Sequence, residues 1–144
     1  MKQGLAVQPY AVPGRSPVPG TVPVNGIEPA TPFPYTPANA RAIDAIKNPA
    51  PRTSESILRG KDRYNIYCAV CHGDAGDGKG LVAPKIGGTV RNLISDPAKA
   101  YSDGRIYSAI RYGFGLMPAY ADKLHPADRW QIVNYVRVLQ GAPQ

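Results

Sequence analysis

The stretch Cys68-Ala69-Val70-Cys71-His72-Gly73 decides the fold of this chain. It holds the only two cysteines among the 144 residues and one of the two histidines. Two cysteines separated by two residues and followed directly by a histidine form the attachment pattern of a covalent c-type haem. The thiols can add across the vinyl groups of the porphyrin, and the adjacent imidazole can then reach the iron. The pattern therefore predicts one covalently bound haem c, attached through Cys68 and Cys71 and ligated by His72.

A cysteine pair can also belong to a zinc site or to a redox-active dithiol. Zinc would need two more ligands, and His125 is the only other histidine in the chain. A redox-active dithiol is expected near the start of a strand-helix unit, whereas these cysteines end a helical pattern and run into glycines. Both alternatives account for the sequence less completely than a haem does.

Residues 1–52 differ in composition from the rest of the chain. Eleven of the 16 prolines lie there, and only one short stretch shows helical periodicity. Proline fixes φ and favours extended neighbours, so this segment is expected to be irregular and polyproline-like. We interpret it as an extended arm that docks on partner subunits, with a flexible solvated tail as the alternative. Residues 53–144 then form a compact haem domain, whose modest core a buried haem would enlarge.

The formal net charge is +7, and the basic excess is spread over both segments. A basic surface can face nucleic acid, anionic lipid or an acidic protein. No arginine-rich block supports nucleic acid, so the expected partner is an acidic protein or a membrane surface. The alternative is that the basic residues form an ordinary solvated surface without a partner. No window approaches the ~18 to 20 apolar residues of a transmembrane helix, and no membrane span is expected.

The start of the chain lacks the apolar segment of a secretory signal. Covalent c-type haem is attached on the oxidising, extracytoplasmic side of a membrane. We therefore expect a signal to have been removed before Met1, and the protein to lie in the periplasm or on the extracytoplasmic face of the membrane.

Apolar periodicity and capping residues predict several helices. Gly60 interrupts one of the predicted helices. Because a glycine there costs about 1 kcal/mol relative to alanine, we expect another backbone to cross closely, and the last helix is the natural partner. The glycine-rich residues 73–92 are predicted to form loops around the haem edge. Helices are predicted over 39–47, over 55–69 with Thr53 or Ser54 as cap, over 102–112 with Ser102 as cap, and over 126–140.

The second axial ligand of the iron separates two classes of function. With histidine and methionine both bound, the iron has no position for a substrate and the protein passes electrons, whereas an open site allows peroxidase or gas-binding chemistry. Methionine is most often core filler. Met117, however, lies 45 residues after His72 on a glycine-bounded loop and is held extended by Pro118, so we predict that it is the ligand. The competitor is His125, whose position fits a helix N-cap better.

A hydrogen bond to His72 is also predicted. The ring nitrogen that does not face the iron needs an acceptor that fixes the tautomer and strengthens the ligand. A backbone carbonyl near Pro84 is the expected acceptor, with a plain turn at this proline as the alternative.

Motifs beyond the attachment pattern resemble those of class I cytochrome c domains. These motifs are Gly60-x-x-x-Tyr64, Gly115-Leu116-Met117-Pro118, and Trp130 with Tyr135 on the last helix. The resemblance covers residues 53–141 and implies a small all-α fold whose first and last helices cross near the glycine. It implies that Gly60 and Tyr64 meet the face of Ile132 and Tyr135.

A narrower resemblance covers nearly the whole chain. The matching stretches are similar to the mono-haem cytochrome c subunit of bacterial alternative complex III. That assembly is a membrane-bound quinol-oxidising complex with iron-sulfur clusters and a separate multi-haem cytochrome. The stretches are Arg59 to Cys68, Gly76 to Gly80, Leu116 to Asp122, Asp128 to Trp130, Tyr135 to Gln140 and, in the arm, Gln8-Pro9 and Gly14 to Val22.

This resemblance implies an electron-transfer subunit that is not an enzyme by itself. Its partners would be the other subunits, including the multi-haem cytochrome, and it would pass electrons to a soluble carrier or a terminal oxidase in a respiratory or photosynthetic chain. Members are often lipoproteins anchored through an N-terminal cysteine; here no cysteine precedes Cys68, so the anchor either precedes Met1 or is missing. Two alternatives stay open: an independent soluble cytochrome c that donates to an oxidase, and a haem enzyme or sensor with an open iron.

Overall fold

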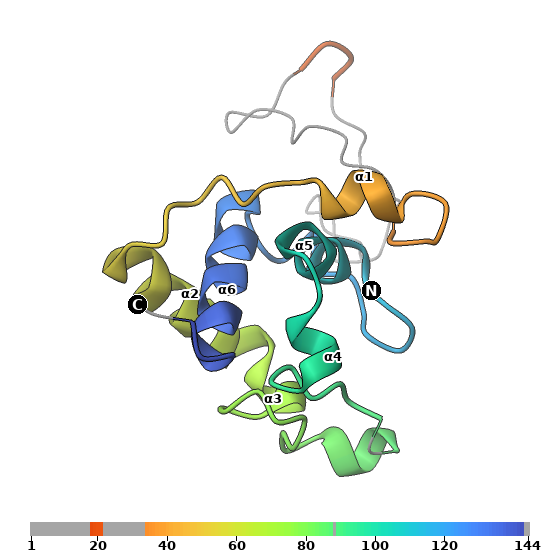
Figure 1. The fold of residues 1–144 in the computed structure, drawn as a ribbon. Coiled ribbons are helices and arrows are strands. Elements are labelled where there is room, and N and C mark those ends of the chain that lie inside the picture. The colour runs from red at the N-terminus through yellow and green to blue at the C-terminus, as the bar shows by residue number, and fades with distance from the viewer. Residues whose placement is uncertain (1–17, 22–33, 88, 143–144) are drawn as a thin grey trace, which may run out of the picture.

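A computed structural model describes residues 18–21, 34–87 and 89–142 (Figure 1). The secondary structure of these residues is helical, with one isolated β bridge between Phe114 and Met117. The predicted all-α class is therefore confirmed. Most of the proline-rich arm lies outside the described residues. In chain order the elements are α1 (Ala40–Asp44), α2 (Ser54–Tyr67), α3 (Ala69–His72), the 3-10 helix η1 (Ala83–Ile86), α4 (Asp96–Lys99), α5 (Asp103–Tyr112) and α6 (Pro126–Leu139).

The crossing of α2 and α6 at Gly60 forms the centre of the fold (Figure 1). A Cβ atom on Gly60 would overlap the carbonyl oxygen of Gln131 and lie 3.1 Å from the Cβ of Tyr135. The predicted crossing is confirmed, since only glycine allows so close an approach. About one turn along α2, the rings of Tyr64 and Tyr135 meet edge to face with centroids 5.3 Å apart. The atoms nearest to a Cβ on Gly60 belong to Gln131 and Tyr135, and the implied contacts of Gly60 and Tyr64 with Tyr135 are confirmed.

Side-chain caps set the starts of the three longest helices. Of the two predicted candidates, Thr53 and Ser54, it is Thr53 that caps α2. Ser102 caps α5 and His125 caps α6, both as predicted. Each cap satisfies one of the amide groups that a helix leaves without a partner in its first turn. The bonds are Ser56 N to Thr53 Oγ1 at 3.2 Å, Arg105 N to Ser102 Oγ at 3.0 Å, and Ala127 N to His125 Nδ1 at 3.4 Å.

The structure departs from the predicted helices in three places. The helix predicted over 39–47 is shorter, because α1 ends at Asp44. The helix predicted over 55–69 ends at Tyr67, and Cys68 separates it from α3. The elements η1 and α4 were not predicted, because each has four residues and so carries too little sequence for a periodic pattern. Nowhere in the described ranges does a helix reach the length and apolar character that crossing a bilayer requires.

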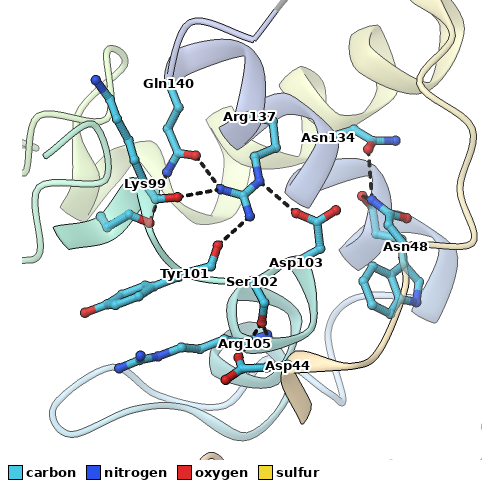
Figure 2. Close-up of polar contacts among 12 residues, drawn as sticks. Asp44, Asn48, Lys99, Tyr101, Ser102, Asp103, Arg105, Asn134, Arg137 and Gln140 are labelled. Carbon is cyan, nitrogen blue, oxygen red and sulfur yellow. Dashed lines mark hydrogen bonds and ion pairs between the residues drawn. The ribbon is translucent and has the colours of Figure 1, made fainter. Parts of the chain in front are cut away.

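The segment before α2, residues 39–51, packs on the helices that follow it, and we call it the strap. Ile43 in α1 is fully buried. A Cβ on Gly104 of α5 would overlap the carbonyl oxygen of Ile43, so this contact too requires a glycine. Two hydrogen bonds drawn in Figure 2 fasten the strap: Ser102 Oγ to Asp44 Oδ1 at 2.5 Å and Asn48 Nδ2 to Asn134 Oδ1 at 2.9 Å. The domain boundary at Thr53 stays a prediction.

The helix crossing can be tested with the substitution Gly60→Ala. We expect a loss of about 1–3 kcal/mol in the free energy of unfolding, the range typical of overpacking, because α2 and α6 must move apart. Urea unfolding followed by circular dichroism measures the change. The matched control is Lys61→Ala, an exposed neighbour on α2, which should shift the stability by less than about 0.5 kcal/mol. Equal stability of the two variants would contradict the close crossing.

Candidate haem-binding site

A cavity of about 360 Å³ lies beside the crossing of α2 and α6. Its volume falls within the roughly 300–1,000 Å³ of small-molecule sites. All four residues predicted to hold the haem line it: Cys68, Cys71, His72 and Met117. His125, the alternative ligand, is exposed at the start of α6 and does not line it. Much of the remaining wall is apolar or aromatic and includes Tyr64, Tyr67, Leu93, Ile106, Ile110, Ile132 and Val136.

The two cysteines come from the junction of α2 with α3. Cys68 is the C-cap of α2, with its amide donating to the Tyr64 carbonyl at 2.8 Å, and Cys71 lies one turn further on in α3. Both are free thiols. Burial, and to a smaller extent the neighbouring Cys71, raises the pKa of the Cys68 thiol to about 12. A redox-active dithiol needs a thiol of lowered pKa, and the raised pKa of Cys68 does not fit that alternative.

The zinc alternative also lacks support from the geometry. Among the residues that the structure describes, no group of three or more His, Cys, Asp and Glu side chains could hold a metal ion. A structural zinc site takes four such ligands. The cysteine pair therefore has no partners for tetrahedral zinc in this part of the chain.

The imidazole of His72 is held in one tautomer. Its Nδ1 lies 3.0 Å from the carbonyl oxygen of Arg91. A carbonyl only accepts, so Nδ1 carries the proton and Nε2 keeps a lone pair. Burial lowers the pKa of His72 more than this hydrogen bond raises it, which favours the neutral ring. A neutral imidazole with a free Nε2 is the form that binds a metal.

The predicted acceptor near Pro84 is therefore wrong. Pro84 lies in η1, and the carbonyl that contacts Nδ1 of His72 is that of Arg91. Nothing in the sequence marks a particular carbonyl as an acceptor, since every residue has one. The sequence could predict that a backbone carbonyl accepts the hydrogen bond from His72, but not which residue supplies that carbonyl.

The glycine-rich loop after α3 folds back on the attachment pattern. The amides of Gly78 and Gly80 donate to the carbonyls of His72 and Cys71, at 2.8 and 3.0 Å. The hydroxyl of the buried Tyr64 donates to the carbonyl of Gly73 at 2.7 Å. These bonds satisfy the carbonyls that the short helix α3 leaves free, and they fix the segment that carries His72.

Met117 lies on a tight turn after α5. The amide and carbonyl of Met117 exchange hydrogen bonds with those of Phe114, both at 3.0 Å. Gly113 has φ +80°, and a Cβ there would lie 2.5 Å from the carbonyl oxygen of Met117. The half-buried thioether lines the same cavity as His72. The turn thus brings a side chain from the second half of the domain to the cysteine pair.

Two arginines, Arg91 and Arg105, are also among the residues that line the cavity. The guanidinium of Arg105 lies over the ring of Tyr101, 3.8 Å from its centroid, and over the ring of Tyr35, at 4.1 Å. Guanidinium groups bind carboxylates well, and a haem carries two as its propionates. With two thiols, a neutral imidazole, a thioether, an apolar wall and these two cations, the residues present fit haem c.

Sequence reasoning missed Arg105 and Tyr35. Tyr101 and Arg105 are four residues apart at the start of a predicted helix, a spacing that favours a contact and could have indicated the pair. Tyr35 carries no such signal, because it lies in the proline-rich segment, 66 residues before Tyr101. Its contact with Arg105 is made by the tertiary fold and has no local signal in the sequence.

Comparison with known proteins defines the class of this chain. The family model described as "Cytochrome C oxidase, cbb3-type, subunit III" matches residues 55–136, more than half of the chain. The chain belongs to this family of cytochrome c domains. The family implies covalently bound haem c and a role in electron transfer. No curated protein sequence matches the chain.

Solved structures that are similar to this chain include the following two. One is from the reducing HAO-like protein complex Kustc0457/Kustc0458 of Kuenenia stuttgartiensis, with a TM-score of 0.55 and 25% identity over 65% of this chain and 49% of that chain. The chain thus spans about half of that structure's length. The other is the c-type cytochrome KustC0563, with 28% identity over 57% of this chain and 94% of that chain and a TM-score of 0.47. The first structure supports the cytochrome c fold.

Proposed function

We propose that this chain transfers single electrons through one haem c, attached at Cys68 and Cys71 and ligated by His72 and Met117. The observation that carries the proposal is that these four side chains line one cavity, although Met117 lies 45 residues beyond His72 in the sequence. When bound, the haem supplies a centre that gains and loses one electron. The residues of the protein would bind this centre, orient its ligands and surround it.

His72 and Met117 would both bind the iron of the haem, and no position would then remain for a substrate. The bond from His72 Nδ1 to the Arg91 carbonyl keeps the imidazole neutral and holds its orientation. A histidine and methionine pair raises the potential relative to two histidines. The thioether of Met117 would therefore both close the site and favour the reduced state.

Tyrosine side chains form part of the wall of the cavity. Tyr64 is fully buried, and Tyr67 and Tyr120 meet edge to face with centroids 6.2 Å apart. Burial raises the pKa of the phenol of Tyr64 and of Tyr120, which keeps both neutral. Neutral aromatic walls of this kind lower the local polarity, and burial is one of the means by which a protein tunes a haem.

We further propose that the chain works as a subunit of a membrane-bound quinol-oxidising complex of the alternative complex III kind. The motifs Arg59 to Cys68 and Leu116 to Asp122 support this assignment by resemblance. The multi-haem cytochrome of that complex would be a partner, and a soluble carrier or terminal oxidase the acceptor. The description of the matching family, an oxidase subunit, favours an oxidase. Such a subunit would lie on the extracytoplasmic face of the membrane, as a lipoprotein or held by its partners.

The strap gives the arm hypothesis a physical basis. Ile43 is buried and Asn48 is bonded to Asn134, so residues 39–51 are part of the packed structure. A partner that bound the residues before Pro34 would therefore hold the haem domain at a short distance. A second candidate is an independent soluble cytochrome c that donates to an oxidase, which the family description also favours.

The ligand assignment is tested by Met117→Leu. We expect the oxidised protein to show the weak charge-transfer band at the red edge of the spectrum that marks sulfur ligation of iron, and Met117→Leu to abolish it. The control His125→Gln should keep the band, since His125 only caps α6. A band that persists in Met117→Leu would contradict the assignment. Carbon monoxide binding to the reduced native protein would favour a haem enzyme or sensor with an open iron.

The arm is tested by truncation. Removal of residues 1–33 should release the haem domain from its complex during purification and leave its spectrum and melting temperature unchanged. Removal of residues 1–52 should in addition lower the melting temperature, because it strips the buried Ile43 and the partner of Asn134. Unaltered co-purification of the shorter truncation would count against the arm and favour another contact surface.

A further inference from the structure

Arg129 is a buried cation that no ligand role explains. It is the fourth residue of α6 and only 1% exposed. It belongs to the stretch Asp128-Arg129-Trp130, whose flanking residues have other contacts. Asp128 pairs with Arg59 at 2.7 Å, and Trp130 stacks on Tyr107 with ring centroids 4.0 Å apart. A guanidinium stays charged at any pH, and burying a charge is costly unless it is hydrogen-bonded.

The hydrogen bonds of Arg129 lead to the segment that carries Met117. Its Nη1 donates to the carbonyls of Ala121 and Leu124, at 3.2 and 3.1 Å. Its Nε donates to the hydroxyl of Tyr107, at 3.3 Å. The two carbonyls belong to the connection between α5 and α6, and Tyr107 belongs to α5. One side chain thus joins α6, α5 and the end of this connection.

The contacts continue from there to the cavity. The amide of Leu124 donates to the carbonyl of Tyr120 at 3.1 Å, and the amide of Tyr120 donates to the carbonyl of Ile110 at 3.0 Å. Tyr120 lines the cavity and lies three residues after Met117. If residues 118–124 moved away, the guanidinium would lose two acceptors inside the protein, where water could not readily replace them.

We propose that Arg129 is a positioning residue that holds the connection between α5 and α6 closed, and so keeps Met117 in the cavity. The inference rests on the proposed function in so far as Met117 is taken as the iron ligand. Arg129 acts through backbone carbonyls and does not itself line the cavity. Its effect is to lower the population of the state in which the thioether has left and an outside ligand can enter.

The test measures that population with imidazole, added to the oxidised holoprotein. An outside ligand that binds only the open state has an apparent dissociation constant equal to the intrinsic one divided by the open fraction. We expect Arg129→Met to tighten imidazole binding by at least about tenfold, because the open fraction rises by that factor. Arg129→Lys keeps the charge with a more compact donor and should tighten binding by a smaller factor.

Two controls separate positioning from general stability. Arg137→Met makes the same change on the same helix, but Arg137 bonds to Asp103 and to the carbonyls of Lys99 and Tyr101 (Figure 2). Asn134→Leu changes a side chain of equal burial whose carbonyl partners, Ala50 and Pro51, lie in the strap. Both controls should lower the melting temperature and leave imidazole affinity within about threefold of the native protein. If they tighten imidazole binding as much as Arg129→Met, the proposal is overturned.

Amide hydrogen exchange gives a readout that does not depend on the iron ligand. In Arg129→Met, or in Arg129→Lys should the first variant not fold, the amides of Tyr120 and Leu124 should exchange faster relative to those of α6. In Arg137→Met this ratio should stay unchanged. Unchanged exchange at Tyr120 and Leu124 in the Arg129 variants would refute the positioning role. Faster exchange together with a sulfur band that survives Met117→Leu would uphold that role and refute the ligand assignment.

Discussion

The close approach of α2 and α6 at Gly60 is the constraint on which the rest of the structure depends. A Cβ at this position would overlap the Gln131 carbonyl, so the two backbones are in direct contact. This contact sets the position of α2 relative to α6, and at the end of α2 Cys68 caps the helix and α3 begins. It also fixes the face of α6 that carries Ile132 and Val136 into the wall of the cavity. A single helix crossing thus sets the positions of both the attachment pattern and the opposite wall of the cavity.

From this crossing, α6 holds the irregular segments by hydrogen bonds from its side chains to their carbonyls. Asn134 binds the strap, and Arg129 binds the connection after α5. Arg137 binds the carbonyl of Tyr101 in the segment after α4 (Figure 2), and Gln140, the C-cap of α6, binds the carbonyl of Leu93 before α4. A domain this small and with short helices has many backbone carbonyls outside helices, and buried carbonyls need partners. A polar side chain on a rigid helix is an efficient partner, because it satisfies the carbonyl and positions the loop in one contact.

The same logic explains which features could be predicted from the sequence. The attachment pattern, the caps Ser102 and His125 and the crossing at Gly60 were predictable, because each requires a particular residue type at a particular spacing. The acceptor of His72 and the acceptors of Arg129 could not be located, because a carbonyl is common to all residues and only the tertiary fold selects one. The short elements η1 and α4 could not be predicted either, because four residues are too few to show a periodic pattern.

The arrangement of the two proposed ligands follows from these constraints and bears on the kind of chemistry that the site supports. His72 is held by the Arg91 carbonyl and by the loop bonds around α3, and Met117 by the Phe114 turn and by the connection that Arg129 binds. Neither side chain therefore depends on its partner for its position, so the surroundings of the cavity need not rearrange when an electron arrives or leaves. Groups fixed in advance cost no reorganisation at the moment of reaction. A site that exchanges substrates needs the opposite, a ligand position that opens easily. The segment that carries Met117 is thus fastened to a buried cation, which favours electron transfer over substrate chemistry. This argument does not depend on the haem attachment pattern.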